Sequence, residues 1–178
     1  MKLTQDYFEL FGLAREFEID ADLLVHRYRD LQRVLHPDKY VNASDQERRM
    51  AMQQAAHVNA GYQTLKDPLA RARYLLSLED GGEGDPEQAT IRDVGFLEEQ
   101  MELRETLMEI RADADPQGGI FHFLAELNSK EKDYIKELSQ AFAAGDSVAL
   151  ARANNLVQRL QFVRRLQQEA EAIEEELL

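Results

Sequence analysis

The fold is decided by a short stretch of sequence, Leu35-His36-Pro37-Asp38. Pro37 has no backbone N–H and disfavours the helical conformation at the preceding residue, so a helix arriving here must end at about Leu35. Residues 20–35 carry apolar side chains at helical spacing on one side and basic side chains on another. The apolar set is Leu24, Tyr28, Leu31 and Leu35, and the basic set is His26, Arg29 and Arg33. The pattern predicts an amphipathic helix with a cationic outer face, followed by a loop that holds the tripeptide.

The sequence after this loop predicts a helix that returns alongside the first. Ser44 and Glu47 have the spacing of a reciprocal capping box, which starts a helix over residues 45–65. A short apolar helical turn, residues 7–11, precedes the pair, and Asp67-Pro68 has the capping acid and first-turn proline of another helix. We therefore expect four helices, with two long antiparallel ones presenting the loop at their tip.

Composition excludes several kinds of chemistry. The 178 residues suffice for one or two small domains with real cores. The chain has no cysteine, which excludes disulfides, thiolate zinc sites, cysteine nucleophiles and cysteine-ligated iron–sulfur clusters. The four histidines lack paired metal-ligand spacing, and no glycine-rich phosphate loop is present. We expect no catalytic residue, no cofactor and no bound metal.

The N-terminal sequence and the hydropathy pattern bear on location. Residues 1–6 lack an apolar signal core and an arginine-rich transit pattern, and no apolar run approaches the length of a membrane span. These features predict a cytoplasmic protein that does not bind a membrane.

Charge is divided unevenly along the chain. Residues 1–78 contain 11 basic and 11 acidic side chains, whereas residues 79–178 contain 10 basic and 23 acidic ones. The second part would repel nucleic acid and anionic membranes. A basic or metal-bearing protein is the better partner for it.

A change in composition at the same place divides the chain into domains. Residues 79–88 hold three glycines and a proline among acids, which is typical of a linker. Beyond it, three long helical stretches are separated by residues 112–119 and by Gly145-Asp146. The prediction is an all-α protein: a four-helix domain over residues 1–78, an acidic glycine-rich linker over 79–89, and a three-helix bundle over 90–178.

The first bundle helix carries two apolar stripes. The core-facing stripe is Phe96, Gln100, Leu103, Leu107 and Ile110. The second stripe is Leu97, Met101 and Met108, roughly 100 to 140 degrees away at the helical repeat, and Glu98, Glu102, Glu105 and Glu109 run beside it. Two interpretations remain: a bundle helix with a broad core face, or a partner-binding strip with an acidic rim.

One residue of the last helix invites the same question. Its core stripe is Ala149, Ala153, Leu156, Leu160, Val163, Leu166 and Ala170. Phe162 lies about 120 degrees from that stripe, so we expect this aromatic ring to face outward and to need an explanation.

These motifs resemble a known family over nearly the whole chain. Residues 3–78 resemble a DnaJ-type J domain, because the His36-Pro37-Asp38 tripeptide, the charge of the helices that flank it and the order of the helices all agree with that domain. A J domain followed by an acidic bundle that opens with residues 96–105 is similar to the HscB family of J-type co-chaperones of iron–sulfur cluster assembly. The resemblance implies that the J domain stimulates the ATPase of a dedicated DnaK-class chaperone (HscA type). It also implies that the bundle binds the scaffold protein (IscU type) and delivers it to that chaperone.

The resemblance also implies two sets of site residues. The chaperone-binding set is His36, Pro37, Asp38, Tyr28, Arg29 and Arg33. The scaffold-binding set is Leu97, Met101, Glu102, Glu105, Glu109 and Phe162. Glu98 departs from the family pattern, which often has an apolar residue there, and Met108 is a candidate to share the apolar role.

Physical chemistry gives the chaperone-binding set a mechanism and an alternative. Arg29 and Arg33, with Tyr28 beside them, suit an acidic patch and favour fast, salt-sensitive encounter. Asp38 then supplies a fixed carboxylate. The alternative for His36 and Asp38 is ordinary turn chemistry. The alternative for the whole protein is a J-domain adaptor whose acidic bundle forms homo-oligomers and which recruits a general chaperone to an unrelated client.

Overall fold

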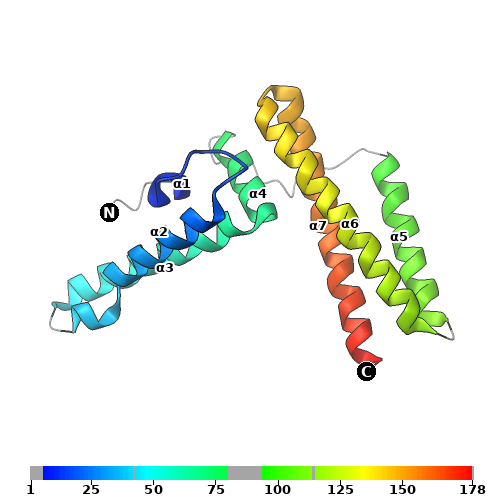
Figure 1. Cartoon of the computed structure of the whole chain (residues 1–178), viewed down its shortest axis with the longest axis horizontal. Helices are drawn as coiled ribbons and strands as arrows, with labels where there is room; N and C mark the ends of the chain where they lie inside the picture. Colours follow the sequence, from blue (N-terminus) through cyan, green and yellow to red (C-terminus); the bar gives the residue numbers. More distant parts are fainter. Residues whose placement is uncertain (1–5, 42, 80–93, 114, 178) are drawn as a thin grey trace. The chain divides into compact units, whose positions relative to one another are not determined.

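The computed structural model describes residues 6–41, 43–79, 94–113 and 115–177, and these are helical throughout apart from connecting turns (Figure 1). The chain divides into two units, Met1–Glu79 and Asp80–Leu178. The first holds α1 (Tyr7–Phe11), α2 (Ala21–Val34), the 3-10 helix η1 (Pro37–Tyr40), α3 (Asp45–Lys66) and α4 (Pro68–Glu79). The second holds α5 (Val94–Ala112), α6 (Pro116–Ala144) and α7 (Ser147–Glu176). The all-α fold predicted from the sequence is confirmed.

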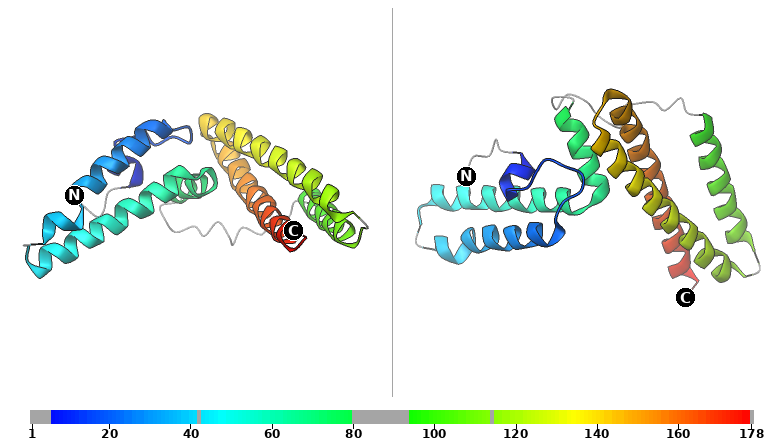
Figure 2. Two further views of the ribbon diagram at one scale, coloured as in Figure 1. Left: turned by 60° about the horizontal axis from the view of Figure 1, so that its bottom comes forward. Right: turned by 45° about the horizontal axis from the view of Figure 1, so that its top comes forward.

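The first unit is built around the antiparallel pair α2 and α3 (Figures 1 and 2). Helix α2 starts where the Asp20 side chain accepts a hydrogen bond from the Leu23 N–H at 2.9 Å. At the start of α3, Ser44 and Glu47 form both bonds of the capping box. Each boundary follows from local sequence, because these caps satisfy N–H groups that have no partner inside the helix.

The connection between α2 and α3 differs from the predicted loop. Helix α2 ends just before Leu35 as expected, but Pro37 then begins η1. Proline suits a first helical position, where no N–H is needed and its φ angle is already helical. The His36 carbonyl accepts from the Lys39 N–H at 3.0 Å, and the His36 ring accepts from the Asp38 N–H at 3.4 Å. The tripeptide therefore lies on a short ordered turn at the tip of the helix pair.

At the opposite end of this pair, α1 lies directly on α3. A Cβ atom on Gly61 would lie 2.8 Å from Tyr7 Cδ1 and 3.1 Å from Phe11 Cε2, so only glycine permits this approach. Phe8 and Phe11 are buried there, and the Tyr7 N–H donates to the Tyr74 hydroxyl of α4 at 3.0 Å. The buried aromatic side chains of α1 thus lie at one end of the helix pair, and η1 lies at the other.

The second unit pairs α6 and α7 as a long antiparallel hairpin, with α5 alongside (Figure 2). Gly145 ends α6 with a φ of +67°, and Asp146 caps α7 by accepting from the Ala149 N–H at 2.8 Å. One apolar cluster joins all three helices. Its buried members are Phe96, Leu103, Leu107, Ile120, Phe123, Leu127, Phe162, Val163, Leu166 and Ala170.

A half-buried carboxylate also links the three helices. Glu99 of α5 accepts from Lys130 Nζ at 3.0 Å and from the Tyr134 hydroxyl at 2.8 Å, both on α6. The same carboxylate accepts from the Arg159 guanidinium of α7 at 2.8 Å. The bond to Glu99 raises the pKa of Lys130, and burial followed by the same carboxylate raises the pKa of Tyr134. This arrangement fixes the rotation of α5 about its own axis.

The predicted break over residues 112–119 is too long. Helix α6 begins at Pro116, where proline takes the first turn and Asp115 caps the helix by accepting from the Gly118 N–H at 3.4 Å. Gly119 therefore lies inside the helix. A Cβ atom there would lie 2.8 Å from Ile110 Cγ2, so this glycine serves the close approach of α5 and α6.

The predicted linker, residues 79–89, lies outside the described residues except for Glu79, which ends α4. Among the helices that the structure describes, none is both long and apolar enough to span a membrane.

Candidate functional site

The tip of the first unit displays a carboxylate and an imidazole. The side chains of His36 and Asp38 are 59% and 86% exposed, and Nδ1 of His36 lies 3.5 Å from Oδ2 of Asp38. Asp38 lies in the first turn of η1, and His36 is the N-cap residue of that helix. Asp38 thus keeps most of its hydrogen-bonding capacity for a partner.

The basic face of α2 leads up to this tip, and its two arginines differ. Arg33 donates to Asp30 at 3.2 Å, which offsets part of its charge. Arg29 is exposed and has no carboxylate partner among the described residues. Arg29 is therefore the more available cation for an acidic surface.

Tyr28 has a different environment from the two arginines. Its hydroxyl donates to Asn59 Oδ1 at 2.9 Å, and its ring stacks on Tyr62 of α3 with centroids 4.0 Å apart. Gln32 donates to the Tyr28 oxygen at 2.6 Å and to Asn59 at 2.9 Å. These contacts join α2 to α3, so the hydroxyl and one ring face of Tyr28 already have partners within the unit.

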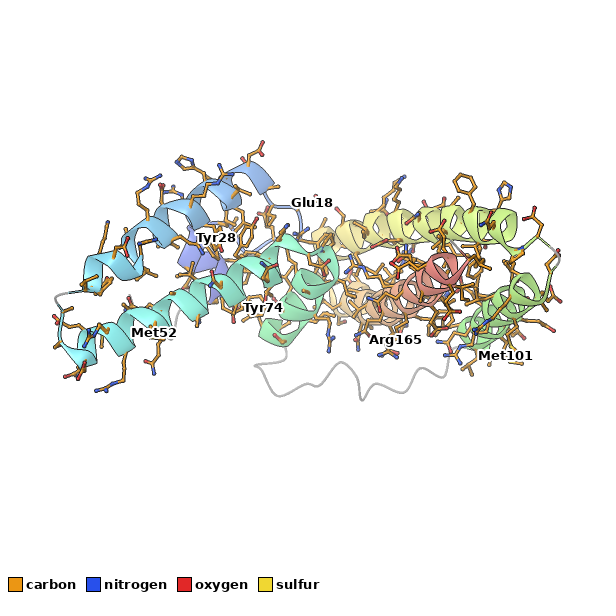
Figure 3. All side chains as sticks on the ribbon, turned by 90° about the horizontal axis from the view of Figure 1, so that it is seen from below. Glu18, Tyr28, Met52, Tyr74, Met101 and Arg165 are labelled. Carbon is orange, nitrogen blue, oxygen red and sulfur yellow. The ribbon has the colours of Figure 1, made fainter. Side chains whose placement is uncertain are left out.

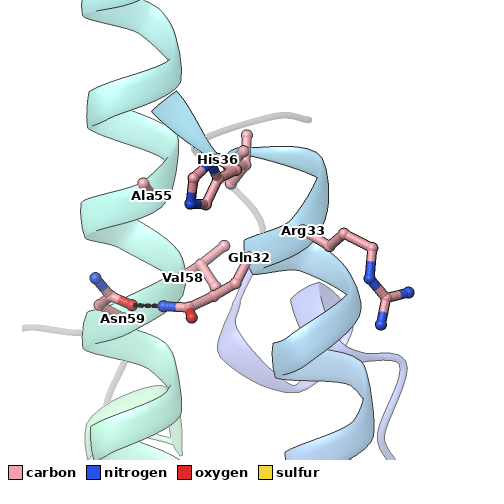
Figure 4. Close-up of a pocket in the computed structure, with 7 residues that line it drawn as sticks. Gln32, Arg33, His36, Ala55, Val58 and Asn59 are labelled. Carbon is pink, nitrogen blue, oxygen red and sulfur yellow. Dashed lines mark hydrogen bonds between the residues drawn. The ribbon is translucent and has the colours of Figure 1, made fainter. Parts of the chain in front are cut away.

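A hollow of about 430 Å³ opens between α2 and α3 next to the tip (Figure 4). It is lined by Gln32, Arg33, Leu35, His36, Ala55, Val58 and Asn59. Figure 4 shows Gln32 reaching Asn59 across it, while the Arg33 side chain points away from α3. Sequence reasoning missed this hollow because its lining joins residues from two helices whose register no local pattern reveals.

The second candidate surface lies on α5. Leu97, Met101 and Met108 are exposed by 50%, 71% and 74%, whereas Phe96, Leu103 and Leu107 are buried. The broad-core interpretation of the second stripe is therefore wrong. The flanking glutamates, Glu98, Glu102, Glu105 and Glu109, are exposed as well. The result is an apolar strip with an acidic rim.

The predicted outward orientation of Phe162 is wrong. This ring is 8% exposed and packs edge-on against Phe96, with centroids 5.9 Å apart. The guanidinium of Arg104 lies 5.7 Å from the Phe162 ring centroid. The prediction assumed that α7 has one buried stripe. Because α7 contacts both α6 and α5, residues outside the stripe that faces α6, such as Phe162, are covered by α5.

Phe162 nevertheless borders open space. A groove of about 370 Å³ runs between α5 and α7. Its lining consists of Phe96, Gln100, Arg104, Gln158, Gln161, Phe162 and Arg165. The groove adjoins the strip, because Arg104 follows Met101 by three residues and precedes Met108 by four, which are neighbouring positions on a helix.

Comparison with known proteins places both units in one family. A family model described as "HSCB C-terminal oligomerisation domain" matches residues 92–171. The "Co-chaperone protein HscB homolog" of Vibrio cholerae serotype O1 is 44% identical, over 97% of this chain and 99% of the relative. This chain belongs to the HscB family of co-chaperones.

Solved structures extend the match to the fold of both units. The chaperone HscB from Vibrio cholerae has a TM-score of 0.82 at 41% identity and covers 98% of this chain and 100% of its own. The human co-chaperone HscB has a TM-score of 0.84 at 28% identity and covers 97% of this chain and 83% of its own. The J domain and the acidic bundle are thus the two parts of an HscB-type co-chaperone.

In this member of the HscB family, the structure brings to the candidate sites several side chains that the sequence did not predict there. They are Gln32 and Asn59 beneath the tip, the three residues bonded to Glu99, and Arg165 in the α5–α7 groove. Each depends on contacts between helices. Among the described residues, no cluster of three or more His, Cys, Asp or Glu side chains suits a metal ion.

Proposed function

We propose that this chain binds an IscU-type iron–sulfur scaffold through its bundle, delivers it to an HscA-type DnaK-class chaperone, and stimulates that chaperone's ATPase through the J domain. The observation that carries the proposal is the exposed strip of Leu97 and Met101 with its acidic rim, in a member of the HscB family. The chain itself acts in the cytoplasm as an adaptor. ATP hydrolysis belongs to the chaperone.

At the J domain, the proposed mechanism has two stages. The exposed cation of Arg29, with a smaller contribution from Arg33, steers the J domain toward an acidic patch on the chaperone. Asp38, held on the first turn of η1, then offers its carboxylate to cationic groups of the chaperone. The His36 ring accepts a hydrogen bond from the Asp38 N–H and so holds the backbone that carries this carboxylate.

At the bundle, the apolar strip supplies most of the binding energy, and the acidic rim favours a partner with basic groups around its apolar pockets. Leu97 and Met101 enter apolar pockets of the scaffold, while Glu102, Glu105 and Glu109 meet basic groups around them. Phe162 contributes from the bottom of the α5–α7 groove, since little of its ring is exposed. Met108 extends the strip on the far side of Glu105.

Calorimetric titration of purified IscU-type scaffold into the chain tests this assignment. Met101→Ala should weaken binding by about 2 kcal/mol, as expected of an interface hot spot, without changing stability. Phe121→Ala is the matched control, because Phe121 is an exposed apolar residue of α6 outside the strip. If both variants bind like the unaltered chain, the strip is not the scaffold site.

The description of the matching family supports a second candidate function for the bundle, self-association. In that case the α5 strip of one copy would contact another copy. Sedimentation velocity of the full chain over a wide concentration range distinguishes the two functions. A chain that stays monomeric throughout has no oligomerising bundle.

A further inference from the structure

The arginines of the second unit differ in whether they have acidic partners. The described residues of this unit include six arginines. Four are paired with carboxylates: Arg111 with Glu176, Arg152 with Glu137, Arg159 with Glu99 and Arg164 with Glu131. The other two, Arg104 and Arg165, have no carboxylate partner among the described residues, and both line the α5–α7 groove. Within the described part of this unit, the guanidinium groups without a carboxylate partner are therefore found at one place.

The remaining lining of the groove is suited to an anion. Among the described residues, the lining also includes three carboxamides, from Gln100, Gln158 and Gln161, and two phenyl rings, but no acidic side chain. This is notable because acidic residues outnumber basic ones by 23 to 10 over residues 79–178. Guanidinium groups bind carboxylates through paired N–H donors, and the carboxamides add further donors.

The orientation of Arg104 favours such binding. Its guanidinium lies over the Phe162 ring, an arrangement that attracts the cation to the ring face. Contact with a ring face leaves the in-plane N–H groups of a guanidinium available to an acceptor. Arg165 is exposed on the α7 side of the groove. Figure 3 shows Met101 and Arg165 on the same side of the second unit.

We propose that the α5–α7 groove binds an aspartate or glutamate side chain of the scaffold protein that docks on the neighbouring strip. This inference rests on the function proposed above and adds a second, oppositely charged contact to it. A protein segment fits both surfaces, because it presents an acidic side chain to the groove and basic side chains to the glutamate rim. Nucleic acid does not fit, because the rim repels a polyanion.

The placement of the two charges gives the interface a direction. The apolar strip lies between the cationic groove and the acidic rim on the surface of α5. A scaffold segment docked in the reverse orientation would bring acid to the rim and base to the groove. Such like-charge contacts disfavour the wrong orientation, so the groove selects how the scaffold is held.

Charge reversal at the groove tests the proposal in the full-length chain. Arg165→Glu changes an exposed side chain, and Lys132→Glu makes the same change of charge at an exposed position of α6 away from the groove. In titrations with purified IscU-type scaffold, Arg165→Glu should weaken binding at least about tenfold and Lys132→Glu less than about threefold. Acidic residues of the scaffold are then reversed to arginine one at a time, and one reversal should restore binding to the Arg165→Glu variant.

Met101→Ala, measured in the same titrations, separates this inference from the proposed function. If Met101→Ala weakens binding and Arg165→Glu behaves like Lys132→Glu, the groove proposal is wrong and the scaffold site on the strip stands. If Met101→Ala and Arg165→Glu both bind like the unaltered chain, both proposals fall. If Arg165→Glu weakens binding and no scaffold reversal restores it, the carboxylate assignment is overturned.

Discussion

The carboxylate of Glu99 and the guanidinium of Arg159 are joined at 2.8 Å, and this bond ties α5 to α7. Lys130 and Tyr134 bring α6 to the same carboxylate, so a single side chain has partners on both neighbouring helices. Glu98 and Glu102, close by in the sequence, are exposed. Glu99 therefore differs from the other acids of α5 in holding the bundle together.

Replacing Glu99 by alanine should destabilise the second unit. The change leaves the amino group, the hydroxyl and the guanidinium around it without their shared acceptor, and we expect a loss of about 2 to 4 kcal/mol. Glu98→Ala, at an exposed position one residue earlier, should stay within about 0.5 kcal/mol of the unaltered chain. Urea unfolding followed by circular dichroism measures both. Equal stabilities for the two variants would contradict the structural role of Glu99.

Phe162→Ala should also destabilise the second unit, whereas Met101→Ala should not. Phe162 is buried against Phe96, and its truncation leaves a cavity that costs about 3 to 5 kcal/mol. Met101 is exposed, so its truncation should change the free energy of unfolding by no more than about 0.5 kcal/mol. Denaturant melts of the two variants decide between a core and a surface position. A Phe162→Ala protein as stable as Met101→Ala would mean that the ring is not part of the core.

Where the sequence predicted the fold correctly, the signal was local. Pro37 ends α2, the Ser44–Glu47 capping box starts α3, and Gly145 ends α6, each through interactions within a few residues. The exposed strip on α5 was visible for a similar reason, since helical periodicity places Leu97 and Met101 on one side.

What the sequence did not reveal depends on contacts between helices. Burial of Phe162 requires α5 to cover a second side of α7, and the bonds of Tyr28 require Asn59 of α3 to lie opposite it. Arg165 could be recognised as a site residue only after α5 and α7 were placed side by side. The start of α6 at Pro116 was also predicted wrongly, but for a local reason. Pro116, Gly118 and Gly119 suggested a longer break between the helices, whereas the Asp115 cap starts α6 at the proline.

Asp38→Asn should abolish stimulation of the chaperone's ATPase while leaving the J domain folded. The carboxylate is exposed and makes no core contact, so its loss removes charge that only a partner would use. Steady-state ATP turnover by purified HscA-type chaperone, with and without the variant, measures the effect. Asp45→Asn, at an exposed acid early in α3, is the control and should stimulate normally. A folded Asp38→Asn protein with full stimulation would remove the tip from the mechanism.

Arg29→Glu should slow association with the chaperone more than Arg33→Glu does. Arg33 already shares its charge with Asp30, whereas Arg29 has no such partner among the described residues. Exposed charges act mainly on encounter, so dissociation should change little and high salt should reduce the difference between the variants. Stopped-flow association rates at low and high ionic strength test this. Rates independent of salt would show that the basic face does not steer.

The stability of the first unit should depend on pH through Asp6. Burial alone raises the pKa of this carboxyl, but hydrogen bonds from the Glu9 N–H and the Arg15 guanidinium outweigh it and leave the pKa below its usual value. Because the folded pKa is depressed, the contribution is complete above the unfolded value of about 3.9 and is lost as pH falls through the lower folded value.

Asp6→Asn isolates this contribution, since asparagine also caps a helix but carries no charge for Arg15. The variant should be less stable than the unaltered chain at neutral pH, and the gap should close as the pH falls below about 4. Urea melts at a series of pH values give the comparison. A gap that stays constant across this range would show that the ion pair with Arg15 contributes nothing.

The four consecutive residues at the start of α5 occupy four different environments. Phe96 is in the core, Leu97 on the strip, Glu98 in the acidic rim, and Glu99 bonded to both neighbouring helices. Successive residues on a helix are turned by about 100 degrees, so one residue inserted or deleted within α5 would move every residue on one side of the change into a different environment. Substitutions along α5 can alter one environment at a time, whereas a change of length cannot. The spacing of residues along α5 is therefore under tighter constraint than the identity of most of its side chains.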